Sequence, residues 1–168
     1  MALTTETYAT NNERNYGVGY TGTIRSVKAL AATEYKKGDF VTVNTAGRAA
    51  KNTANDAEID GIVTSNVDNS EGGNDDVMVP VLVRGTAWVD IIVGNATGSL
   101  GEAFNVGAQC SVYGDGGTTA ATGQAVAAAT GSNKIFTSLA TQAVVAGTSS
   151  ATALRKGLML FRGSDKFI

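Results

Sequence analysis

The densest group of side chains able to do chemistry is an acidic segment near the middle of the chain, Asp68-Asn-Ser-Glu-Gly-Gly-Asn-Asp-Asp76. Its carboxylate, amide and hydroxyl oxygens are the hard ligands that Ca²⁺ prefers. The segment lacks the alternating ligands and the distal glutamate of a helix-loop-helix calcium site. Its central Gly-Gly pair, flanked by Asn, Ser and Asp, is typical of a long exposed turn. We therefore expect a solvated loop and no metal site.

Paired carboxylates that hydrolyse a glycosidic bond are a second possible chemistry. The candidates are Asp56, Glu58, Asp60, Asp75, Asp76, Asp90 and Glu102. Any acidic chain offers such residues, and nothing in their spacing places two of them across a cleft. Asp90 alternates with Trp88 and Ile92, which fits a solvent-facing strand position equally well. No catalytic pair is predicted.

Histidine is absent from the sequence, and Cys110 is the only cysteine. This composition removes the usual general base, the usual neutral metal ligand and every Ser-His or Cys-His nucleophile pair. Cys110 lies in an apparent strand, Ala108–Tyr113, where we expect a small buried hydrophobe. Two glycine-rich segments, Gly17–Tyr20 and Gly114–Gly117, lack the spacing of a phosphate-binding loop and are expected to be turns. We expect no enzymatic activity and no cofactor.

Composition and charge also exclude two kinds of partner. Only 17% of the 168 residues are charged, the formal net charge is −2, and the lysines and arginines are scattered. Without a basic stripe, nucleic-acid binding is not expected. The longest apolar region, Val77–Val93, is interrupted by Arg84 and Gly85 and is too short for a membrane span. The N-terminus has neither a basic start nor an apolar signal core, so no export route is expected.

Small and β-branched residues dominate the chain, with 21 Gly and one Pro, whereas strong helix formers are sparse. Strand-like segments alternate with turns, and the clearest are Thr23–Ala29, Phe40–Val43, Gly61–Thr64, Val77–Arg84 and Ala87–Val93. Pro80 cannot donate to a β ladder, which favours an edge strand or a bulge there. The many short strands predict an all-β fold, either a small β-barrel or a β-sandwich.

A short internal repeat links two distant parts of the chain. Three positions recur at a constant spacing of 69 residues: Gly38 with Gly107, Val43 with Val112, and Gly47 with Gly116. The match is either a repeated hairpin or a chance recurrence of a common strand-turn-strand pattern. Both interpretations stay open at the level of sequence.

Residues 1–22 are polar and rich in Thr, Asn and Gly, and they predict an extended N-terminal arm before a single β domain, 23–168. Tyr8, Tyr16 and Tyr20 give this arm apolar area to bury while their hydroxyls remain free to form hydrogen bonds. The arm is therefore either flexible or docked against a neighbour.

Three segments of the domain together resemble small capsid decoration, or cement, proteins of tailed bacteriophages. They are Lys37-Gly-Asp-Phe-Val-Thr-Val43, Ile59-Asp-Gly-Ile-Val63 and Val81-Leu-Val-Arg-Gly-Thr-Ala-Trp-Val89. In that family such segments form a turn-strand, a second strand and a strand pair in a small β-barrel. The resemblance covers residues 35–115, and neither the arm nor residues 118–153 has a counterpart in it.

The resemblance implies a virion structural protein on the outer surface of an icosahedral capsid. Such proteins commonly sit as homotrimers at local three-fold positions and help the shell resist internal DNA pressure. The implied partners are the major capsid protein and neighbouring copies of the chain. Capsid or subunit contacts would come from Tyr8, Tyr16, Tyr20 and Trp88, and from an edge strand around Val77–Val83.

Two other functions fit the same sequence. A self-assembling capsid, tail or fibre subunit would also be an all-β protein without catalytic residues. A carbohydrate-binding β module would use Trp88 and exposed tyrosines as stacking surfaces for sugars. Trp88 also fits an ordinary place in the core or in a subunit interface.

Overall fold

The structure, a computed structural model, describes residues 21–54, 58–92, 105–113, 125–128, 133–140 and 154–163. Within these ranges the secondary structure consists of strands without helices, which confirms the all-β prediction. None of the described residues belongs to a helix that could cross a membrane. The predicted contact residues Tyr8, Tyr16 and Tyr20 lie outside the described part of the chain.

Most strands are short, and β7 is the exception with 15 residues. The strands are β1 (Thr21–Ala29), β2 (Thr33–Tyr35), β3 (Phe40–Val43), β4 (Arg48–Lys51), β5 (Gly61–Val63), β6 (Val67–Asn69), β7 (Met78–Ile92), β8 (Gln109–Tyr113), β9 (Ala125–Ala128), β10 (Phe136–Ser138) and β11 (Leu154–Phe161). β1 begins two residues before the predicted boundary between arm and domain. β2 and β6 pair only with each other, and the other nine strands form one sheet.

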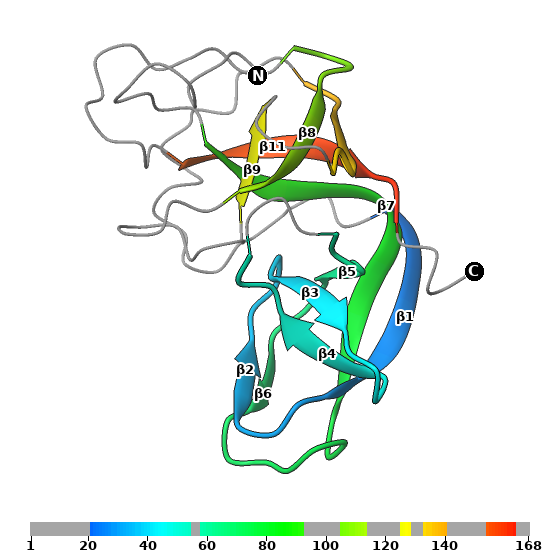
Figure 1. Ribbon diagram of the computed structural model, residues 1–168, viewed down its shortest axis with the longest axis vertical. Coiled ribbons are helices and arrows are strands. Elements are labelled where there is room, and N and C mark those ends of the chain that lie inside the picture. The colour runs from blue at the N-terminus through cyan, green and yellow to red at the C-terminus, as the bar shows by residue number, and fades with distance from the viewer. Residues whose placement is uncertain are drawn as a thin grey trace.

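The sheet closes on itself twice. β1, β4, β3, β5 and β7 are hydrogen-bonded in that order, and β7 pairs with β1 again, which closes a ring that we call the first barrel. β7, β11, β10, β8 and β9 form a second ring, because β9 pairs with β7; we call it the second barrel. β7 belongs to both rings and runs through both halves of the molecule (Figure 1). Of the two predicted architectures, the strand pairing is that of a barrel.

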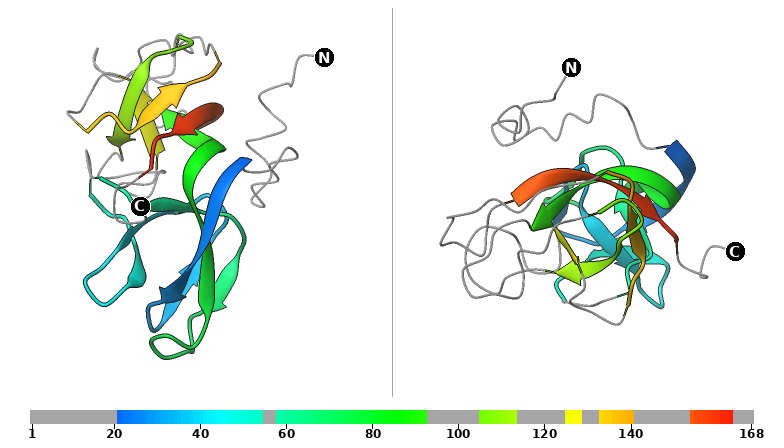
Figure 2. Two further views of the ribbon diagram at one scale, coloured as in Figure 1. Left: turned by 90° about the vertical axis from the view of Figure 1, so that its right-hand side faces the viewer. Right: turned by 90° about the horizontal axis from the view of Figure 1, so that it is seen from above.

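A β-bulge allows one strand to serve two barrels. Thr23 of β1 lies opposite Arg84, whereas Ile24 lies opposite Leu82, so Val83 is the extra residue on β7. An extra residue shifts the alternation of side chains by one. Before the bulge the odd-numbered residues of β7 face the interior of the first barrel, and after it they lie on the opposite face, in the second barrel. Figure 2 shows the strong twist of β7 between the two halves.

Two glycines let β1 and β7 approach closely beside this bulge. Gly22 and Gly85 are paired across the strands, with φ angles of 151° and 144°. A Cβ atom on Gly85 would overlap the carbonyl oxygen of Thr21, and its distance from the Gly22 Cα would be 2.7 Å. Only glycine combines this backbone conformation with this spacing.

The first barrel has a core of small side chains. Its buried members are Val27, Ala29, Tyr35, Val41, Ala49, Val63, Val79, Val81 and Val83. Tyr35 comes from β2 and is fully buried. Its hydroxyl donates to the Ala49 carbonyl oxygen at 2.7 Å and accepts from the Leu30 amide at 2.8 Å. The buried hydroxyl of Tyr35 is therefore satisfied both as a donor and as an acceptor.

The second core extends beyond the second barrel and holds the two barrels together. Phe40, Ile62 and Leu82 lie on the outer face of the first barrel and belong to the same buried cluster as the interior of the second. The ring of Phe136 lies 5.4 Å from that of Phe40 and 5.4 Å from that of Phe161, centroid to centroid. We call this row of three phenylalanines the seam. It buries apolar surface from both barrels at once.

The two barrels repeat the same strand pairing, register by register. β3 and β5 pair through Val41 and Gly61, and β8 and β10 pair in the same way through Cys110 and Phe136. The remaining equivalences follow from the other ladders: β1 corresponds to the C-terminal half of β7, β4 to β9, and the N-terminal half of β7 to β11. The chain therefore contains a structural repeat in which β7 closes one unit and opens the next.

The turns before β3 and β8 repeat as well. Gly38 and Gly107 have φ angles of 90° and 87°. The Gly38 amide donates to the Val63 carbonyl oxygen at 2.7 Å, and the Gly107 amide donates to that of Ser138 at 2.8 Å. Of the two interpretations left open for the spacing of 69 residues, the geometry of these turns and of the strands that follow favours a repeated hairpin over a chance recurrence; Gly116 lies outside the described residues.

Of the two alternatives predicted at Pro80, the edge strand is wrong, and the bulge of β7 lies three residues further along the strand, at Val83. β7 is the most central strand, with neighbours on both sides, and it is one continuous strand instead of the two that were predicted. The Pro80 carbonyl oxygen accepts a hydrogen bond from the Thr64 amide at 2.9 Å. Its missing N–H therefore faces the side on which β5 has just ended at Val63, so no ladder hydrogen bond is lost.

Candidate functional site

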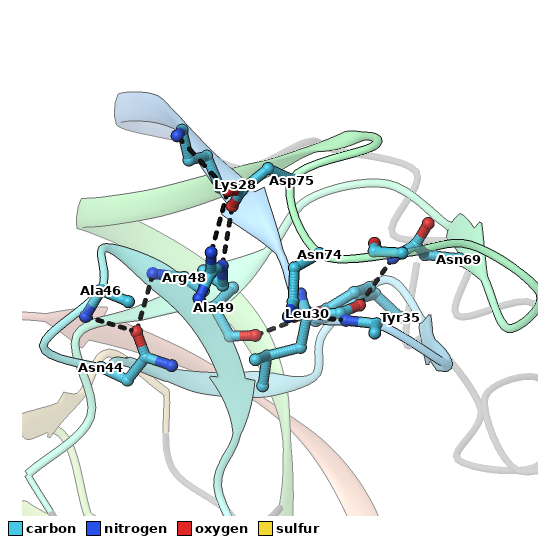
Figure 3. A network of polar contacts seen from close by, with 12 residues as sticks. Lys28, Leu30, Tyr35, Asn44, Ala46, Arg48, Ala49, Asn69, Asn74 and Asp75 are labelled. Carbon is cyan, nitrogen blue, oxygen red and sulfur yellow. Dashed lines mark hydrogen bonds and ion pairs between the residues drawn. The ribbon is translucent and has the colours of Figure 1, made fainter.

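The acidic loop between β6 and β7 is fastened to the first barrel by an arginine. Asp75 accepts hydrogen bonds from Arg48 Nε at 2.8 Å and Nη2 at 2.9 Å, and it lies 3.6 Å from Lys28 Nζ (Figure 3). The hydrogen bond from Arg48 is the main reason why the pKa of Asp75 is below its ordinary value. This carboxylate connects the loop to β4 and β1.

Amide side chains hold the rest of the loop. Asn69 is buried, and its Nδ2 donates to the carbonyl oxygens of Leu30 at 2.6 Å and Gly73 at 2.9 Å. The Oδ1 of Asn74 accepts from the Ala31 amide at 2.9 Å. These bonds tie the loop to the turn after β1, as Figure 3 shows for Asn69 and Leu30.

Two further carboxylates of the acidic segment accept hydrogen bonds from donors within the segment itself. Asp68 Oδ1 accepts from the amide of Ser70 at 2.9 Å and from its hydroxyl at 2.6 Å, and the hydroxyl bond is the main cause of its lowered pKa. Asp76 Oδ2 accepts from the Gly73 amide at 2.5 Å. Across the described residues, no three metal-ligating side chains lie together. Asp68, Asp75 and Asp76 therefore stabilise the fold of the loop.

Cys110 is buried in the core of the second barrel, which confirms the prediction for this residue. Loss of solvation raises the pKa of its thiol to about 11. Its Sγ donates to the carbonyl oxygen of Ala108 at 3.5 Å. The side chain is therefore protonated at neutral pH and acts as a small hydrophobe.

Trp88 lies on β7, directly opposite Leu158 of β11. Its neighbours along the strand, Ala87 and Val89, are buried inside the second barrel. Trp88 is half-buried and points to the outer face, because side chains alternate along a strand. It thus lies apart from the seam, and its role as a capsid or subunit contact stays a prediction.

Equivalent outer faces of the two barrels differ in chemistry. Phe40, Ile62 and Leu82 of the first barrel are fully buried under the second. The equivalent positions of the second barrel hold Gln109, Thr137 and Leu160. Leu160 is 37% exposed, and two of the three side chains are polar. This face is suited to solvent and does not present a second seam.

The first six residues of β1 are the longest exposed stretch of any described strand. Thr21–Ser26 are all exposed, including Ile24 at 48%, although they pair with β7 throughout. Sequence reasoning identified this strand but not its exposure. The paired residues of β7 are at least fifty positions away in sequence, and the alternation of Val27 and Ala29 with polar neighbours indicates only a half-buried strand.

Comparisons with protein-family models, with curated proteins and with solved structures gave no match for this chain.

Proposed function

We propose that this protein is a virion structural protein that binds the outer surface of an icosahedral capsid and stabilises it, as decoration proteins do. The observation that carries the proposal is the sharing of β7 between two closed barrels. One continuous strand and the seam of Phe40, Phe136 and Phe161 fix the orientation of each barrel relative to the other. A body of this kind suits a protein that holds neighbouring subunits at fixed positions.

The polar chemistry of the described residues supports a structural role as well. Asp68, Asp75 and Asp76 bind donors of their own loop or barrel, and Cys110 is held as a neutral thiol in the core. These groups stabilise strands and turns. They are not directed towards a common point where a substrate would bind.

Under this proposal the partners are the major capsid protein and neighbouring copies of the chain, arranged as a homotrimer. Tyr8, Tyr16, Tyr20 and Trp88 remain the proposed contact residues. Because β1 begins at Thr21, deletion of residues 1–20 is the clean test of the tyrosines. We expect a folded protein with reduced affinity for capsids, whereas an unchanged affinity would remove the tyrosines from the proposal.

The primary experiment is co-sedimentation of the purified protein with expanded, undecorated capsids, together with its mass by light scattering. Saturable binding at a fixed ratio to the capsid subunit, by a species of three times the chain mass, is the expected result. A folded protein that never sediments with capsids would refute decoration. Growth into large particles without capsids would favour a self-assembling shell, tail or fibre subunit.

A further inference from the structure

In its N-terminal half, β1 has one edge that pairs with no strand of the described part of the chain. Thr21–Lys28 pair with β7, whereas pairing with β4 involves only Lys28 and Ala29. No other described strand pairs with the remaining edge of β1. A row of unpaired peptide groups on an exposed strand is a ready template for another strand.

The hydrogen bonds of Ala29 show which peptide groups lie on that edge. Its amide donates to the Val77 carbonyl oxygen at 3.0 Å, and its carbonyl oxygen accepts from the Asp75 amide at 3.1 Å, so both groups face the β7 side. Peptide groups alternate in direction along a strand. Those of Gly22, Ile24 and Ser26 therefore face away from β7, towards the free edge.

In the second barrel the equivalent edge, which belongs to β7, is paired with a further strand. There the C-terminal half of β7 takes the place of β1, and β11 pairs with one of its edges. At Arg84–Thr86 the other edge carries an antiparallel strand, which is β1 itself. By the repeat, Gly22–Ile24 are the equivalent positions on β1. Among the described residues, the first unit thus has no strand at the place where β1 pairs with the second unit.

Two arginines indicate the chemistry of the missing strand. Arg84 lies opposite Thr23, and Arg25 is two residues further along β1, so both side chains project from the same face of this two-stranded ribbon. Both are exposed, and neither forms an ion pair with any described residue. The next basic residue of β1, Lys28, has Asp75 as its partner.

We propose that the Gly22–Ser26 edge of β1 binds an extended, carboxylate-bearing segment of a partner protein as an added β-strand. Peptide groups supply the pairing, and the guanidinium groups of Arg25 and Arg84 select acidic side chains on one face of the incoming strand. A second copy of this chain is disfavoured, because edge-to-edge pairing would place the arginines of both copies on one ribbon. The inference rests on the edge itself and goes beyond attachment to a capsid.

The test uses a fluorescein-labelled peptide of alternating Val and Glu, in which the carboxylates lie on one face of an extended strand. Matched peptides carry Gln or Lys in place of Glu. By fluorescence anisotropy we expect saturable binding of the Glu peptide and binding about tenfold weaker for the Gln peptide. In hydrogen exchange, the amides of Ile24 and Ser26 should become protected when the Glu peptide binds. Equal binding of the Glu and Gln peptides, or no binding, would overturn the proposal.

Variants test separately the contribution of the arginine side chains and that of the backbone amides to peptide binding. The double variant Arg25→Glu, Arg84→Glu should lose the Glu peptide and bind the Lys peptide, whereas Lys134→Glu, an exposed charge in front of β10, should bind as the unchanged protein does. Ser26→Pro removes one donor of the free edge and none of the β7 ladder, so it should weaken binding while the thermal midpoint stays close to that of the unchanged protein.

Two results would contradict the proposal even if a peptide bound. One is retention of Glu-peptide binding by the double arginine variant. The other is a doubled mass in light scattering that Ser26→Pro abolishes, which would identify a second copy as the occupant. If the protein bound the Glu peptide but did not sediment with capsids, this inference would stand and only the proposed function would be refuted.

Discussion

The two barrels share one hydrogen-bonding framework and fill it with different side chains. The first has a core built mainly from valine and alanine, together with the buried Tyr35. The second contains Phe136, Phe161 and Met159 in equivalent surroundings. Register and turn geometry are conserved between them, whereas residue volume is not. The comparison shows that the backbone pairing defines this repeat, whereas each unit fills its core with its own set of side chains.

Two pairs of equivalent positions show how volume is exchanged. Ala29 and Val79 of the first barrel correspond to Ile91 and Gly157 of the second. In the first barrel the smaller residue of the pair is Ala29 on β1, whereas in the second barrel it is Gly157 on β11. A Cβ atom on Gly157 would lie 2.8 Å from Cγ2 of Ile91, so the isoleucine already occupies the space that Val79 occupies in the first barrel. Each barrel therefore has its own complementary pair.

The largest expected effect tests the difference between covered and uncovered outer faces. Leu82→Ala should lower the free energy of unfolding by about 2–5 kcal/mol, because it opens a cavity between the barrels. The equivalent substitution, Leu160→Ala, should change it by at most about 0.5 kcal/mol, since that side chain is already partly in solvent. Urea unfolding followed by tryptophan fluorescence measures both. Similar losses at the two positions would show that the second barrel's face is covered too.

The volume exchange can be tested by restoring the first barrel's pair in the second. Gly157→Val alone should destabilise the protein by about 1–3 kcal/mol through overpacking against Ile91. The double variant Gly157→Val, Ile91→Ala should be more stable than the sum of the single effects, with a coupling of about 0.5–3 kcal/mol. A double-mutant cycle in urea gives this coupling. Additive effects would mean that the two positions do not compensate each other.

The next test compares the cost of adding a Cβ atom at Gly85, where β1 and β7 approach closely, with the cost at Gly47 in an ordinary turn. Gly85→Ala should cost about 1–3 kcal/mol, because the φ angle of 144° is unfavourable for alanine and its Cβ would overlap the Thr21 carbonyl group. Gly47→Ala is the control, with a φ angle of 76° and no atom within 4 Å of the new Cβ. We expect about 1 kcal/mol there. Equal losses in thermal unfolding would argue against a close approach of β1 and β7.

The smallest expected effect concerns the first barrel alone, which has the arginine-linked loop. The pKa of Asp75 is lowered in the folded protein, so its contribution to stability is present above the ordinary value of 3.8 and is lost as the pH falls below it. Asp75→Asn should therefore lower the thermal midpoint slightly at pH 7. The difference should vanish in strong acid, where both proteins carry a neutral side chain. A difference that persists there would assign the effect to packing.

Local patterns predicted the strands with strong β-branched or apolar alternation. Phe40–Val43 was predicted with its observed bounds, and Gly61–Thr64 within one residue. β4 was missed because its only fully inward side chain is Ala49, which leaves no apolar alternation to detect. β2 and β6 were missed because three-residue strands carry almost no periodic signal.

Long-range pairing explains what sequence reasoning could not supply. The central position of Pro80 depends on where β5 ends, and the free edge of β1 depends on how far β4 extends along it. Neither is a property of the local sequence. The Arg48–Asp75 pair joins residues 27 positions apart, and each residue alone looks like any exposed charge. The spacing of Gly38 and Gly107 was the one signal that reported on the whole architecture.

The dual membership of β7 also sets an order of events during synthesis. The first barrel needs only residues up to Thr86, so it can close before the second half of the chain has been synthesised and has left the ribosome. Until that half emerges, Phe40, Ile62 and Leu82 form a naked apolar surface on a finished barrel. Nascent chains halted after the first barrel should therefore associate through this apolar surface. When the second barrel folds, it covers the surface and removes this tendency.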